Sequence, residues 1–189
     1  MNGNRKAGIL IAAGMVQFMM LMLLAETLYP HYSVSTNYIS DLGVGSTALL
    51  FNGSIILLGV MLLLAAYVSK ETIKSHSMWI LIAIVGLASI GVGTFPETTG
   101  IPHYIFALIA FGGGAITAIN SARILKGAIR PLVVILGAIS LAALIIGVGF
   151  HTTLGLGNGG MERMIAYPVF LWTLLFGGYL LGDKSGKQT

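Results

Sequence analysis

The side chains in this sequence best suited to bind a metal ion or to move a proton are histidines. His103 follows Pro102, which suits the first position of a helix, and the positive end of the helix dipole there disfavours a protonated imidazole. A neutral imidazole is the form that ligates metals and acts as a general base. His151 follows a segment of small residues, so His103 and His151 together could ligate a haem or a divalent metal ion.

Acidic residues accompany these histidines in short polar segments. Ser40 and Asp41 lie in the segment 37–43, Asn-Tyr-Ile-Ser-Asp-Leu-Gly, and Glu97 follows the dipeptide Phe-Pro in a turn. A carboxylate near an imidazole could bind a polar ligand or take part in proton transfer. A structural role is the alternative, because Ser40 or Asp41 could cap a helix end and Glu97 could be a solvated turn residue.

Glu162 and Arg163 stand side by side before the last apolar run. Arg163 could hold a phosphate group, or the two residues could pair with each other, or the acid could cap the helix start. As candidate catalytic residues we take His103 and Asp41, and as candidate ligand-binding residues Ser40, Glu97, Glu162 and Arg163.

Motifs with a fixed catalytic geometry are absent from the sequence. It has no cysteine, which excludes disulfides, thiolate catalysis and cysteine-ligated clusters. It also has no HExxH or HxxxH pattern. The segment 155–160, Gly-Leu-Gly-Asn-Gly-Gly, lacks the lysine of a phosphate-binding loop, and we predict a tight turn there.

The elements that position these residues are long apolar runs. Of 189 residues, 56% are hydrophobic and 8% are charged, against roughly 25% charged in a soluble domain. Each run is about 20 residues long, enough to span a bilayer core. We therefore predict an all-α, polytopic membrane protein that lies in a lipid bilayer and forms one domain, 1–189. Its six transmembrane helices are expected at about 7–29, 48–68, 77–94, 102–122, 131–151 and 163–182.

The basic residues predict the orientation of this bundle. Nine of the ten fall on the side of the two termini, and only Arg163 falls on the other side. Because cytoplasmic loops carry the excess of lysine and arginine, both termini are expected in the cytoplasm of a multi-pass cell-membrane protein. The net charge of +4 reflects this bias and does not indicate nucleic-acid binding. Most of the acids and three of the four histidines, in contrast, fall on the outer side.

The order of these polar segments resembles a known family. The segment 37–43, the Phe95-Pro96-Glu97 turn, His103 and the 160–163 segment, Gly-Met-Glu-Arg, occur together in this order. They resemble the six-helix membrane-protein family catalogued as domain of unknown function 998. The resemblance implies the fold and the topology, but it brings no reaction with it. The residues that match the family pattern are Ser40, Asp41, Glu97, His103, Glu162 and Arg163.

Three functions remain open at this point. The first is an outward-facing polar pocket between helix ends that binds a small polar ligand or a lipid head group. The second is a haem or metal protein that uses His103 and His151. The third is a structural or partner-binding membrane protein without catalysis. The inner halves of the apolar runs hold few polar residues, which disfavours transport.

Overall fold

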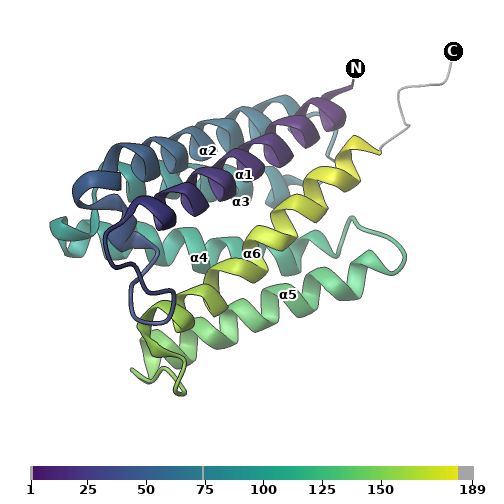
Figure 1. Cartoon of the computed structure of the whole chain (residues 1–189). Coiled ribbons are helices and arrows are strands. Elements are labelled where there is room, and N and C mark those ends of the chain that lie inside the picture. Colours follow the sequence, from purple (N-terminus) through teal and green to yellow (C-terminus); the bar gives the residue numbers. More distant parts are fainter. Residues whose placement is uncertain (1, 74, 183–189) are drawn as a thin grey trace, which may run out of the picture.

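The computed structural model describes residues 2–73 and 75–182, and in these ranges the chain forms helices and turns without any strand. In these ranges six helices are long and apolar enough to cross a membrane, which confirms the predicted all-α class and the number of helices of spanning length. Lys74 and the tail 183–189, both predicted on the basic side, lie outside the described residues. The long helices are α1 (Gly3–Leu28), α2 (Ala48–Ser69), α3 (His76–Thr94), α4 (Ile101–Ser121), α5 (Ile129–Leu144) and α6 (Gly157–Leu181) (Figure 1).

Local capping moves some helix ends from their predicted positions. α1 begins at Gly3 rather than at residue 7, because the Asn2 side chain accepts a hydrogen bond of 3.0 Å from the Arg5 N–H. α4 begins at Ile101, after Gly100 takes a φ of 71° that suits glycine. Three short 3-10 helices lie in the connections: η1 (Ser40–Gly43), η2 (Gly45–Thr47) and η3 (Glu97–Thr99).

The predicted start of the last helix is wrong. The glycine-rich segment 155–160 is not only a turn, because α6 already begins at Gly157. The Gly159 and Gly160 N–H groups donate to the Ser35 carbonyl oxygen at 2.9 and 3.3 Å, so a distant loop satisfies free donors of the first turn. Residues 162 and 163 therefore lie in the second turn of α6 and do not open it.

The end of the fifth span also differs from the prediction. After α5 the chain continues in a π-helical turn, η4 (Ile145–Gly149), which widens the helix. His151 lies beyond this turn with a φ of 51°, so it does not close the helix.

The helices pack in chain order around the bundle, and α6 closes the ring against α1 while also touching α4. Several contacts depend on glycine. A Cβ atom at Gly59 of α2 would lie 2.5 Å from the Gly86 carbonyl oxygen of α3. One at Gly8 of α1 would lie 2.7 Å from the Gly177 carbonyl oxygen of α6. Small residues thus bring the backbones together, as in other membrane bundles.

The two ends of the bundle differ in character. α1 begins and α6 ends at the same end (Figure 1). At the opposite end, which we call the distal end, the connections 29–47, 95–100 and 150–156 lie together around one cavity. All the candidate site residues predicted above lie at this end or in the helix turns next to it.

Candidate functional site

Arg163 of α6 organises the distal end from inside the protein. It is only 6% exposed and forms a salt bridge of 2.5 Å with Glu26 at the end of α1. The same terminal nitrogen donates to the Tyr32 hydroxyl at 2.7 Å. The other one donates to three backbone carbonyl oxygens, those of Val34, Asn37 and Gly159, at 2.9 to 3.2 Å. Both terminal nitrogens thus tie the 29–47 connection to α1 and α6.

This network answers the question of how Glu162 and Arg163 are paired. Neighbouring residues on a helix point in different directions, and each finds its own partner. Arg163 pairs with Glu26, whereas the Glu162 carboxylate accepts a hydrogen bond from the Ile39 N–H. Sequence reasoning did not select Glu26 and Tyr32 as site residues. The signal that could have found Glu26 is its position, an acid one turn inside an apolar run, which indicates a buried partner.

Asp41 shapes the loop of the 37–43 segment. Its Oδ2 atom accepts hydrogen bonds from the Asn37 side chain at 2.9 Å and from the Tyr38 N–H at 3.0 Å. With Glu97, Asp41 lines a shallow hollow of about 250 Å³ on the surface of the distal end. It does not line the larger cavity described below.

Ser40 and Glu97 connect two loops that are far apart in the sequence. The Ser40 hydroxyl donates to the Glu97 carboxylate at 3.2 Å and so joins η1 to η3. Partial burial raises the pKa of Glu97 to about 7, with a further increase from the neighbouring Asp41 carboxyl and a smaller opposing effect of the Ser40 hydroxyl. Near neutral pH this carboxyl can therefore be either a donor or an acceptor.

His103 lies in the first turn of α4 and is only 4% exposed. Its Nδ1 atom lies 2.8 Å from the Phe95 carbonyl oxygen. Because a carbonyl oxygen can only accept, Nδ1 carries the proton, and in the neutral ring Nε2 is an acceptor. No other described residue hydrogen-bonds to the ring, so Nε2 is free for a ligand.

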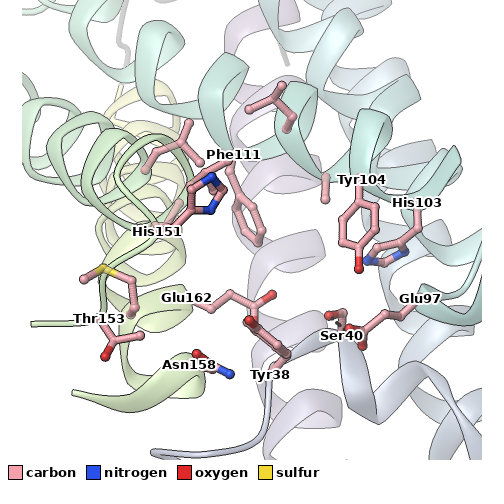
Figure 2. A pocket seen from close by; sticks show the side chains of 17 residues that line it. Tyr38, Ser40, Glu97, His103, Tyr104, Phe111, His151, Thr153, Asn158 and Glu162 are labelled. Carbon is pink, nitrogen blue, oxygen red and sulfur yellow. Dashed lines mark hydrogen bonds between the residues drawn. The ribbon is translucent and has the colours of Figure 1, made fainter. Parts of the chain in front are cut away.

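A cavity of about 630 Å³ lies between α4, η4 and the start of α6. Its distal part is polar, and the walls deeper in the span are apolar. Figure 2 shows Tyr38, Ser40, Glu97 and Glu162 along one edge of the cavity and Phe111 away from them. The lining residues are Tyr38, Ser40, Glu97, His103, Tyr104, Ala107, Leu108, Phe111, Leu144, Gly147, Val148, His151, Thr153, Asn158, Met161, Glu162 and Ile165.

The cavity brings some of the predicted site residues together and leaves others apart. Ser40, Glu97, His103, His151 and Glu162 line it, whereas Asp41 and Arg163 do not. Sequence reasoning missed its apolar and aromatic lining. These residues lie among many similar ones in apolar runs, so nothing in the sequence distinguishes them.

The histidines enter this site in different ways. His151 is exposed, and it lies on the cavity wall opposite the start of α4. Its backbone has a left-handed conformation. His31 is also exposed and left-handed, in the connection 29–47. Within residues 2–73 and 75–182, no group of three or more His, Asp or Glu side chains is placed to hold a metal ion. His103 and His151 would be the two protein ligands available to a haem in this cavity.

The comparisons with known proteins give a family match. No curated protein and no solved structure matches the chain significantly. The family described as "Protein of unknown function (DUF998)" matches residues 12–179, a range that contains both the 37–43 segment and the start of α6. With its six apolar helices and this match over most of its length, the chain belongs to the DUF998 family.

Proposed function

We propose that this chain is a single transmembrane domain of the cell membrane with both termini in the cytoplasm. Nine of the ten basic residues fall on the side of the termini, and the positive-inside bias assigns that side to the cytoplasm. The distal end, with its cavity, then faces outward.

We further propose that the cavity binds an amphiphilic molecule, such as a lipid, with its polar head at the distal end. The observation that carries this proposal is that buried polar atoms and an apolar wall share one space of about 630 Å³. A small polar ligand would leave the apolar part of that space unused. An alkyl chain there would gain about 0.8 kcal/mol for each CH₂ group that it buries away from water.

We assign roles to the polar residues as follows. His103 Nε2 and the Glu162 carboxylate contact the head group, and Ser40 holds Glu97 toward it. His103 is the group that transfers a proton in any reaction on the head group, since its Nε2 atom has no partner among the described residues. Asp41 keeps the loop in place, and Arg163 supports the cavity from behind.

Filling the apolar part of the cavity tests this proposal. Ala107 lines the cavity on α4, and Ala138 is an exposed alanine on α5, so Ala107→Trp and its control Ala138→Trp add the same bulk. The probes are four amphiphiles with one C14 chain and different heads: trimethylammonium, primary amine, glycerol ester and phosphate. Binding to protein in non-ionic micelles is measured by native mass spectrometry.

We expect the natural chain to retain one molecule of at least one probe. Ala107→Trp should weaken that binding about tenfold or more, as expected when 1.4 kcal/mol or more is lost, while Ala138→Trp keeps it. If both variants bind as the natural chain does, the amphiphile proposal is wrong. The distal network would then serve only to hold the loops together.

A second candidate is haem binding, favoured by the single fact that His103 and His151 line the same cavity. His103 and His151 would hold the haem iron, and the bound haem would supply redox chemistry. An absorption spectrum of the purified protein tests it. A Soret band that His103→Gln abolishes supports a haem site, and a preparation that takes up no added haem rejects it.

A further inference from the structure

The charge of the cavity indicates what kind of head group it can take. Among its seventeen lining residues, all of them described, there are two carboxylates, Glu97 and Glu162, and no lysine or arginine. Arg163 follows Glu162 in the chain, but both of its terminal nitrogens donate to protein acceptors. Its Nε atom is buried out of reach of the cavity. An anionic head would therefore find carboxylates and no fixed positive charge.

Two ionisable residues of the site, His103 and Glu162, each have an unpartnered hydrogen-bond acceptor. His103 is more than nine-tenths buried, and its Nε2 atom offers a lone pair to the cavity because Nδ1 donates to the Phe95 carbonyl oxygen. One oxygen of Glu162 accepts from the Ile39 N–H, and the other makes no hydrogen bond with any described residue. Both residues line the cavity, so these acceptors can take a donor or a positive charge from a bound molecule.

Aromatic rings complete this lining. Tyr38, Tyr104 and Phe111 all line the cavity, and Figure 2 shows Tyr104 beside His103 and Phe111 deeper within. The faces of aromatic rings attract cations, and rings combined with carboxylates form the usual cage for ammonium groups.

We infer that the head group bound in this cavity is cationic, an amine or a quaternary ammonium on an alkyl or acyl chain, and that Glu162 and Glu97 are its counter-charges. This inference rests on the proposed amphiphile binding and names the chemical class of the ligand.

The four C14 probes test the inference in competition, with free choline as a fifth probe that has the head but no chain. We expect the trimethylammonium or amine probe to bind at least tenfold more tightly than the phosphate probe. Choline should bind far more weakly than either, because it leaves the apolar wall uncovered. Glu162→Gln, which can still accept from the Ile39 N–H, should weaken binding of the cationic probe about tenfold more than binding of the glycerol ester. Glu97→Gln is the second variant, and a thermal unfolding curve of each confirms that it folds.

Each outcome separates the two proposals. Tighter binding of the phosphate or glycerol probe, lost in Ala107→Trp, would overturn the cationic head but keep the amphiphile site. Equal binding of choline and the C14 cation would mean a polar site for free amines, and it would overturn the role of the alkyl chain. If Ala107→Trp changes no binding, the proposed function itself fails.

Discussion

At the scale of single residues, Arg163 shows why side-chain chemistry alone did not reveal its role. An arginine near a helix start suggests phosphate binding, but here its terminal nitrogens are used by Glu26, Tyr32 and three backbone carbonyl oxygens. These acceptors lie far from it in the sequence, and only the fold brings them near. The histidine and acids of the cavity were predictable, because ionisable groups at membrane depth are costly and usually face an interior or a cavity.

Removing Arg163 should therefore destabilise the protein. It should not change which head-group charge the cavity prefers. Arg163→Met leaves Glu26 as an unpaired buried carboxylate, and breaking such a pair typically costs about 3–5 kcal/mol. The free energy of unfolding in mixed micelles measures the loss. The matched control is Arg123→Met on an exposed arginine, which should lie within about 0.5 kcal/mol of the natural chain. Equal stability of both variants would contradict the structural role.

Glu97 should make stability depend on pH. Its pKa in the folded protein, about 7, is above the ordinary value of 4.5, so the folded state binds the proton more tightly. Its contribution to stability is fully present below pH 4.5 and is lost as the pH rises through 7. The groups that face it are Ser40, Asp41 and, more distantly, Glu162.

The measurement is the midpoint temperature of thermal unfolding, taken at several pH values between 5 and 8. We expect this midpoint to fall less with rising pH in Glu97→Gln than in the natural chain. Glu71→Gln, at an exposed acid on the other side of the bundle, is the control and should keep the natural slope. A Glu97→Gln variant with an unchanged slope would show that this carboxyl does not carry the pH dependence.

At the scale of elements, the start of α6 is where the sequence was least informative. Three glycines between residues 157 and 160 favour a turn, since glycine is a poor helix former. The structure uses them for close approach, because the connection 29–47 runs directly over the first turn of α6 and supplies the Ser35 carbonyl oxygen. The other spans followed from apolar length alone, because no water reaches a bilayer core and helices satisfy their own backbone groups.

A pair of glycine variants tests this close approach. In Gly159→Ala the new Cβ would lie 2.6 Å from the Val34 carbonyl oxygen and closer still to that of Asn37, so α6 and the loop must separate. In Gly178→Ala, on the same helix, nothing lies within 4 Å of the new Cβ. We expect the second change to stabilise the protein by up to about 1 kcal/mol and the first to destabilise it. Thermal unfolding checks the signs, and a stabilised Gly159→Ala would contradict the packing.

At the scale of the whole molecule, the sequence predicted the number of spans because hydropathy acts over whole helices. It could not predict the cavity, which lies between α4, η4 and the start of α6. The lining of that space depends on the π-helical turn and on the path of a loop, and both are results of packing.

The proposed orientation can be tested by labelling single introduced cysteines. The natural chain has no cysteine, so any label reports only the introduced thiol. Thr98→Cys places a thiol at an exposed position of the distal end, and Arg123→Cys places one at an exposed position of the connection between α4 and α5. A membrane-impermeant maleimide should label Thr98→Cys in intact cells and Arg123→Cys only after permeabilisation. The reverse pattern would place the termini outside.

The central claim is that an amphiphile lies in the cavity with its head at the distal end. The most direct test is a crystal structure of the protein with dodecyltrimethylammonium that carries bromine at the end of its chain. We predict an anomalous bromine peak beside Phe111 and Leu144, with the ammonium near Glu162 and His103. Bromine peaks found only on the lipid-facing sides of the helices, with none in the cavity, would contradict the claim.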